Sequence, residues 1–318
     1  MITSQMAGIN VYASQVKQHS SGLIAEGKDS KNNSANSTEE TSPKSAVDTV
    51  SISNAALQVA KNSVATTSSS YYEQFMPTYE GFSAANIAAG VSAPNVDTFS
   101  AGKDFDQVAK DARASLDKNY ERLESIGKPF NASSSQAVDR SSLLGELDRR
   151  ALYAVVSNEG GLFTKDEQDV ARNKMSQQVS LAMGMYSGPI SEEDKFIDPF
   201  MGDKAQKYKA GIQFLDQVSN EEKGSSITFA HQRASLQKMY ENVVTEQGGT
   251  PEDLTSDNSL VNLILEAMNS ADGDLKRGQT FGSITNLDDL KRQPWFEPFA
   301  DRLDNIIDKT KDLYLGDN

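Results

Sequence analysis

The sequence predicts an all-α protein, an irregular bundle of about seven or eight helices preceded by a disordered N-terminal arm. Beyond residue 104, apolar residues recur at steps of three and four, which is the period of an amphipathic helix. No stretch of useful length alternates between apolar and polar residues as a half-buried strand does. The first 70 residues differ in composition from the rest of the 318-residue chain.

Residues 1–70 contain 15 Ser, 6 Thr and 6 Asn, and Tyr12 is their single aromatic residue. Such a segment has too little apolar surface to offset the entropy lost on ordering, so we expect a disordered leader. Its five acidic and five basic residues balance, so the net charge of −14 belongs to the rest of the chain. We therefore divide the remainder into an irregular aromatic segment packed on the body (71–103) and an acidic helical domain (104–318).

One short helix is expected inside the leader, at 53–64. Ile52, just before the capping Ser53, can form a hydrophobic staple with Leu57. Ala60 and Val64 then share the face of Leu57. An isolated helix of this length is marginal in water, so its apolar face needs a surface on which to fold. That surface is either another protein or the body of this chain.

Two parts of the leader resemble segments of bacterial secretion and flagellar proteins. Residues 1–20 carry no acid and are rich in Ser and Gln, which resembles the start of type III or flagellar export substrates. The stretch Asp48-Thr-Val-Ser-Ile-Ser-Asn-Ala-Ala is similar to the Asp-x-Val-x-Leu/Ile-Ser-x-x-Ala segments of flagellum-associated proteins, including anti-sigma factors. These resemblances imply an export signal or a docking helix.

The body begins with two predicted helices. Asp104 can cap the first, and Gly127 with Pro129 can end it. The apolar residues that carry the second helix are Leu143, Leu144, Leu147, Ala151, Leu152 and Val155.

A capping box formed by Thr164 and Glu167 opens the third helix, which we expect to end at Gly188-Pro189. Ser191-Glu-Glu-Asp begins a short helical piece. Further helices are expected at roughly 203–218, 226–246, 257–269 and 298–315.

Composition excludes several classes of function. The chain has no cysteine, so disulfides, thiolate catalysis and thiolate metal sites are impossible. An acidic body repels phosphate backbones, which argues against nucleic acid and favours a cationic protein partner. No apolar run has the length of a membrane span, so we expect no membrane insertion. The chain is then cytoplasmic, or exported without a cleaved Sec signal; its oligomeric state is not determined.

The loop Ser157-Asn-Glu-Gly-Gly-Leu-Phe-Thr-Lys-Asp-Glu167 has three interpretations. A calcium loop is rejected, because Val156 and Gly160 would stand where carboxylates are needed. Alternatively, Glu159-Gly-Gly resembles the opening of a phage-type muramidase family, whose general acid would correspond to Glu159. Gly278-Gln-Thr-Phe-Gly-Ser-Ile-Thr285 resembles a second motif of that family. However, Leu162 replaces the family's Tyr, and we find no second carboxylate for a glycosidase.

The third interpretation of this loop is structural, and we favour it. Gly160 and Gly161 would supply a left-handed helix end. Leu162 and Phe163 would fill the junction, and Thr164 would restart the chain as a helix.

Two other features are candidate sites. Pro294-Trp-Phe-Glu-Pro-Phe299 is interpreted as a plug that seats the last helix, with Pro298 as its first residue; the alternative is that Trp295 and Phe296 anchor a partner. The chain has only two histidines, so a catalytic triad or a histidine metal site is not expected. We expect His231 to be a partly exposed helix residue.

The sequence therefore predicts a bacterial, non-enzymatic protein-interaction protein, exported or flagellum-associated, without cofactor or metal. The alternative is a muramidase-like peptidoglycan hydrolase that uses Glu159. The residues predicted to dock a partner are Ile52, Leu57, Ala60, Val64, Trp295 and Phe296.

Overall fold

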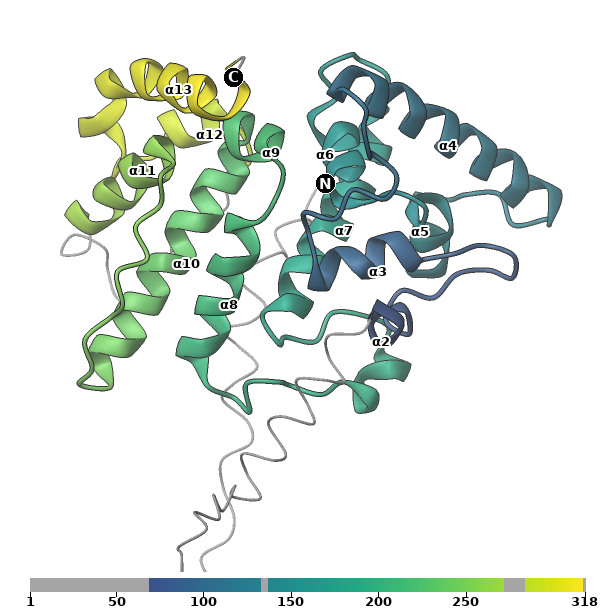
Figure 1. Cartoon of the computed structure of the whole chain (residues 1–318), viewed down its shortest axis with the longest axis horizontal. Coiled ribbons are helices and arrows are strands. Elements are labelled where there is room, and N and C mark those ends of the chain that lie inside the picture. Colours follow the sequence, from purple (N-terminus) through teal and green to yellow (C-terminus); the bar gives the residue numbers. More distant parts are fainter. Residues whose placement is uncertain (1–68, 133–136, 272–283, 317–318) are drawn as a thin grey trace, which may run out of the picture. The chain divides into compact units, whose positions relative to one another are not determined.

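The computed structural model describes residues 69–132, 137–271 and 284–316 (Figure 1), so the expected helix at 53–64 lies outside the described residues. Every regular element within these ranges is a helix, which confirms the all-α fold class. The first half contains α2 (Ser69–Glu73), α3 (Ala85–Ser92), α4 (Phe105–Ser125), α5 (Ala137–Leu144), α6 (Arg149–Ser157) and α7 (Lys165–Ala182).

The second half continues from α7 through a long connection. Its elements are the 3₁₀ helix η2 (Ile190–Lys195), α8 (Lys204–Asp216), α9 (Asn220–Ser225), α10 (Ile227–Glu246), α11 (Ser259–Ser270), α12 (Leu287–Lys291), the 3₁₀ helix η3 (Glu297–Phe299) and α13 (Ala300–Leu315). More helices are present than expected because several are too short to show a periodic pattern; α2, α9 and α12 have five, six and five residues.

Capping side chains fix where α4 and α7 begin, as the sequence predicts. The Asp104 carboxylate accepts a hydrogen bond from the backbone N–H of Gln107 at 2.8 Å. Thr164 and Glu167 form the expected capping box at the start of α7. These contacts satisfy backbone donors that have no partner inside the helix.

The helix expected across residues 143–155 is in fact two helices, α5 and α6. At the break, a Cβ on Gly145 would lie 1.9 Å from the backbone oxygen of Ser83, so only glycine permits this close approach. Asp148 then caps α6 and also accepts the backbone N–H groups of Phe99 and Ser100 at 2.9 and 2.8 Å. Contacts to a distant segment therefore outweigh the local apolar period.

The aromatic segment 71–103 is less irregular than expected. It contains α2 and α3, and it contributes the fully buried Phe75 and Ile87 to the core. Helix α7, conversely, ends at Ala182, before the expected Gly188-Pro189, because Gly184 adopts a left-handed φ of 65°.

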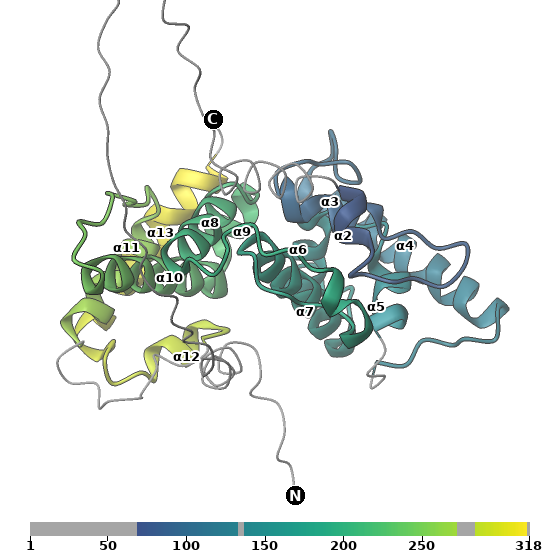
Figure 2. The same cartoon turned by 90° about the horizontal axis from the view of Figure 1, so that it is seen from below.

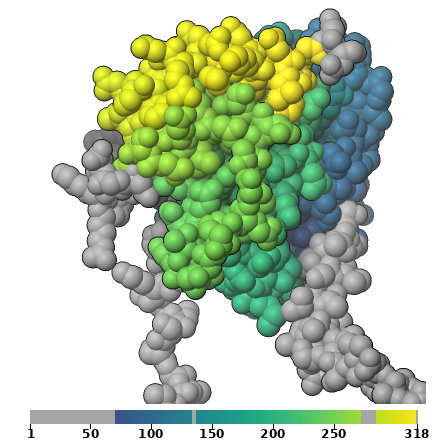
Figure 3. All heavy atoms as spheres, turned by 60° about the vertical axis from the view of Figure 1, so that its left-hand side comes forward, coloured from purple at the N-terminus to yellow at the C-terminus, as the bar shows by residue number. Residues whose placement is uncertain are grey.

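Buried apolar side chains form two clusters within these residues. The first cluster joins α2 to α7, and the second joins the end of α7 to α8, α10, α11 and α13. Helix α10 lies between α8 and α11 in two perpendicular views (Figures 1 and 2). Figure 3 shows α13 as a continuous layer over the neighbouring C-terminal helices. No helix of the described ranges has an apolar stretch long enough to cross a bilayer.

A buried ion pair links the two clusters. The Arg149 guanidinium on α6 donates to both carboxylate oxygens of Glu222 on α9, at 2.7 and 3.0 Å. It also donates to the backbone oxygen of Met175 and the side chain of Gln178 on α7, and it lies 4.8 Å from the centre of the Phe214 ring on α8. The Arg149 and Glu222 side chains are 2% and 5% exposed. One side chain therefore contacts three helices besides its own.

His231 is buried, which corrects the expectation of partial exposure. It is 3% exposed on α10, and its Nε2 has no hydrogen-bond partner among the described residues. Burial lowers the pKa of His231 to about 4, because the charged imidazolium would lose its hydration. The reason is that α8, α9 and α11 all pack against α10, a surrounding that a local pattern does not reveal.

We predict that Arg149→Met lowers the free energy of unfolding by about 3–5 kcal/mol, because it leaves the Glu222 carboxylate buried without a counter-charge. The double variant Arg149→Met/Glu222→Leu should recover most of this loss. Arg302→Met is the matched control, since Arg302 pairs with Glu266 at a site where both are 52% exposed, and its effect should stay within about 1 kcal/mol. Urea denaturation measures the free energy of unfolding of all three variants. Equal losses of stability in Arg149→Met and Arg302→Met would contradict a stabilising role for the buried Arg149–Glu222 pair.

We also predict an acid-sensitive stability from His231. Its folded pKa lies below its unfolded value, so the unfolded chain binds the proton more readily as pH falls from about 6.5 to about 4. The free energy of unfolding therefore falls over this window, by at most about 1.4 kcal/mol per pH unit from this group. His231→Leu should remove that slope, and His19→Gln, at the other histidine, should keep it. Identical pH profiles for both variants would contradict the prediction.

Candidate functional site

Glu159 lies exposed in the connection between α6 and α7, and its side chain makes no hydrogen bond or ion pair within the described residues. A glycosidase general acid normally lies in a buried, apolar surrounding, which the exposed Glu159 lacks. Glu167 is the other acid of this loop to which the sequence assigns a position, and it is buried. Its carboxylate accepts hydrogen bonds from Arg113 at 2.8 Å and from the Tyr120 hydroxyl at 3.0 Å. Residues Gly278 to Ser283 of the second muramidase-like motif lie outside the described residues.

The loop around Glu159 is organised differently from the structural interpretation in two details. Asn158, with φ of 49°, provides the left-handed end of α6, and Gly161 takes the second left-handed position, whereas Gly160 does not. The Asn158 side chain then closes the loop through both backbone groups of Phe163, at 2.8 and 3.0 Å. Phe163 is buried as expected, but Leu162 is exposed.

The predicted partner anchors divide by burial. Phe296 is fully buried in the second cluster, while Trp295 is partly exposed and packs against the same cluster. Their rings meet edge to face at 5.8 Å. Pro298 lies in η3, ahead of α13, and is therefore not its first residue. Ile52, Leu57, Ala60 and Val64 lie outside the described residues.

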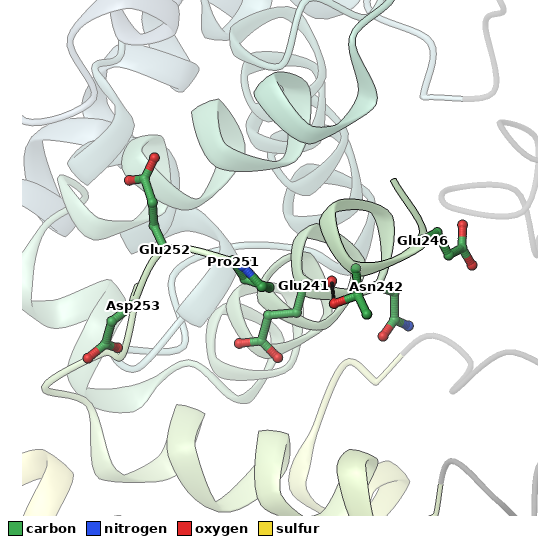
Figure 4. Close-up of a pocket in the computed structure, with 7 residues that line it drawn as sticks. Glu241, Asn242, Glu246, Pro251, Glu252 and Asp253 are labelled. Carbon is green, nitrogen blue, oxygen red and sulfur yellow. Dashed lines mark hydrogen bonds between the residues drawn. The ribbon is translucent and has the colours of Figure 1, made fainter. Parts of the chain in front are cut away.

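An acidic groove lies between the end of α10 and the segment that follows it. Figure 4 shows that the carboxylates of Glu241, Glu246, Glu252 and Asp253 point in different directions and do not converge. Lys209 donates to both oxygens of Glu252 at 2.7 Å, which neutralises that charge. Across the described ranges, no group of three or more His, Asp and Glu side chains is arranged to hold a metal ion.

The connection between α7 and α8, residues 183–203, differs from the other loops in its length and in what it exposes. Connections longer than about 12–15 residues with little regular structure are uncommon and often functional. Among the large apolar side chains of the described residues, the two most exposed are Ile190 at 88% and Met201 at 62%, and both lie here. Figure 1 shows the connection running from α7 past α2 to the start of α8.

Aromatic packing holds the middle of this α7–α8 connection. The Phe196 ring lies 5.6 Å from the rings of both Phe75 and Tyr186. The backbone N–H of Ile197 donates to the Tyr71 hydroxyl at 2.7 Å. These contacts attach the connection to the segment around α2.

Polar contacts hold its two ends. Near the start, Gln177 on α7 donates to the backbone oxygen of Ser187 at 2.8 Å. Near the other end, Asp198 accepts the backbone N–H groups of Phe200 and Gly202 and pairs with Lys207 at 2.5 Å. The exposed side chains of the connection therefore project from a fixed backbone.

Two further features mark the exposed positions. Met201 has a φ of 51°, and Asn158 is the only other non-glycine residue of the described ranges with a positive φ. Met, unlike Asn, has no short polar side chain that favours this conformation. Residues 190–203 also carry five acids and one lysine, and Glu193 and Asp194 are exposed without an ion pair in the described structure.

Sequence reasoning assigned no role to this connection. The breakers Gly188-Pro189 and Gly202 and the acidic run were visible in the sequence. Exposure of Ile190 and Met201 was not, because it depends on which apolar residues the distant Tyr71 and Phe75 cover. No protein-family model, no curated protein and no solved structure matches the chain.

We predict that Met201→Gly raises the free energy of unfolding by about 1 kcal/mol, because glycine adopts the left-handed conformation without the Cβ clash. Asn158→Gly is the matched control: it should lower stability, since it removes the two bonds to Phe163. Urea denaturation of the two variants measures the difference. A destabilised Met201→Gly would show that the Met201 side chain stabilises the fold.

Proposed function

We propose that this chain is a bacterial, non-enzymatic protein-interaction protein, exported or flagellum-associated, whose acidic helical body binds another protein. The observation that carries the proposal is the α7–α8 connection, which holds Ile190 and Met201 exposed on a fixed backbone. Both side chains are therefore available for apolar contact with a partner. The export or flagellar part of the proposal rests on the two resemblances of the leader.

The charge of the chain supports a protein partner over other classes. A net charge of −14 repels nucleic acid and anionic lipid and attracts a cationic surface. The charges of the connection have the same sign as the whole chain. Electrostatic attraction of this kind accelerates encounter with an oppositely charged partner.

We predict that a photo-crosslinking amino acid placed at position 190 of the full chain, expressed in its source bacterium, captures one discrete protein. The same residue at position 126 is the matched control, since Ile126 is 47% exposed at the end of α4, outside the connection. Position 126 should give no such product. If no protein is captured at position 190, 126 or 295, the proposal is contradicted.

The hydrolase alternative gives the opposite result in a second assay. The unmutated protein is expected not to clear peptidoglycan. Clearing that is lost in Glu159→Gln and kept in Glu124→Gln, an exposed acid on α4, would replace the interaction proposal with the muramidase-like one.

A further inference from the structure

Helix α7 carries a lysine whose amine is buried. Lys174 is 3% exposed, and its Nζ donates to the Ser141 hydroxyl on α5 at 2.8 Å and to the side-chain oxygen of Gln177 at 3.0 Å. Gln177 in turn donates to the backbone oxygens of Phe75 and Ser187, at 3.0 and 2.8 Å. The Lys174 amine therefore belongs to a buried polar cluster that joins α7 to α5, to the segment around α2 and to the α7–α8 connection.

Within the residues that the structure describes, no carboxylate lies within ion-pair distance of the Lys174 amine; its two hydrogen-bond partners are both uncharged. Asp139, the single acid of α5, instead accepts a hydrogen bond from the Tyr79 hydroxyl at 2.7 Å. The charge that does act on Lys174 is that of Arg140, also on α5, and it has the same sign. The nearby charge therefore disfavours the protonated amine.

The other helices packed on α7 do not supply a counter-charge. Helix α3 has no titratable side chain. Helix α6 reaches α7 through Arg149, which pairs with Glu222. Helix α8 reaches the backbone beyond α7 through Lys207, which pairs with Asp198.

The cluster fits a neutral amine better than an ammonium. An ammonium has a full charge and three N–H donors, whereas a neutral amine has two donors, and two acceptors are present. Burial, and to a smaller extent repulsion by Arg140, lowers the pKa of Lys174 to about 7. A lysine in water keeps its proton up to about pH 10.4. The same amine therefore holds its proton much more tightly once it reaches water.

We propose that this cluster is a pH-sensitive switch, in which release of α5 brings the Lys174 amine into water and lets it take up a proton, and proton loss favours the docked helix. Helix α5 is the element that moves, because it has only eight residues, packs mainly on α4 and contacts the amine through Ser141. Its release would uncover Leu143 and Leu144, which are fully buried in the first cluster. This inference does not depend on the proposed function, since it concerns an equilibrium within the chain.

The direction of the switch follows from the two protonation equilibria. The pKa of Lys174 is about 7 in the docked form and about 10.4 in the released form, so the released form binds more protons between these values. Release therefore increases as pH falls through this window and levels off below it. The equilibrium constant for release should rise about ninefold from pH 9 to pH 8, about fivefold from pH 8 to pH 7 and about twofold from pH 7 to pH 6. The window lies above that of His231, which separates the two effects.

Nuclear magnetic resonance of the full chain, with lysine labelled by carbon-13 at Cε, tests the titration. One lysine should titrate near pH 7, and its signal should be missing in Lys174→Met. Lys118→Met is the matched control, since Lys118 is exposed on α4, and it should keep that signal. Arg140→Gln should move the same titration to higher pH, because it removes the like charge. This last variant assigns the signal even if Lys174→Met does not fold.

Amide hydrogen exchange of α5 measures the release itself. After division by the intrinsic exchange rate at each pH, protection of the α5 amides should rise about fivefold from pH 7 to pH 8 and about ninefold from pH 8 to pH 9. Lys118→Met should behave in the same way, and Lys174→Met should show no such rise. The α5 amides should also be less protected than the slowest amides of α10, because the release is local.

Three outcomes would overturn the inference. In the first, every lysine titrates above about pH 9.5, as lysines in water do. In the second, protection of α5 in the unmutated chain does not change between pH 7 and pH 9. In the third, the α5 amides are as protected as the slowest amides of α10, which would mean that Lys174 acts only through global unfolding.

Discussion

The buried guanidinium of Arg149 is the constraint on which the described structure depends. It is carried by α6, pairs with Glu222 on α9, donates to Met175 and Gln178 on α7 and lies 4.8 Å from the centre of the Phe214 ring on α8. Removing two charges from water costs free energy. This cost is offset only if the buried charges make several hydrogen bonds with good geometry. The bidentate pair and the two contacts to α7 do so, and they join helices whose apolar faces belong to two separate clusters.

The same region determines where the α7–α8 connection can lie. The Gln178 side-chain oxygen accepts a hydrogen bond from Arg149. Its neighbour Gln177 donates a hydrogen bond to the backbone oxygen of Ser187 at the start of the connection. Gln177 also donates to the backbone oxygen of Phe75, whose ring packs on Phe196 further along. The connection is thus attached at Ser187, Phe196 and Ile197 by contacts that continue to the centre of the fold.

Much of the fold was predictable because helix starts depend on neighbours in sequence. Asp104 and the Thr164–Glu167 capping box act within one turn, so the sequence shows them directly. The break at Gly145 depends on Ser83, and the burial of His231 depends on three packed helices. Exposure of Ile190 likewise depends on partners far along the chain. Features of this kind cannot be inferred from local periodicity, which is why the sequence does not mark the α7–α8 connection as a binding surface.

The central claim is that Arg149 makes the two clusters one cooperative unit. Native-state hydrogen exchange in increasing urea tests it most directly, because it measures the opening free energy of each helix separately. The slowest amides of α4, in the first cluster, and of α10, in the second, should converge on the same free energy of opening. If α10 opens at a much lower free energy while α4 stays protected, the clusters are independent and the ion pair does not couple them.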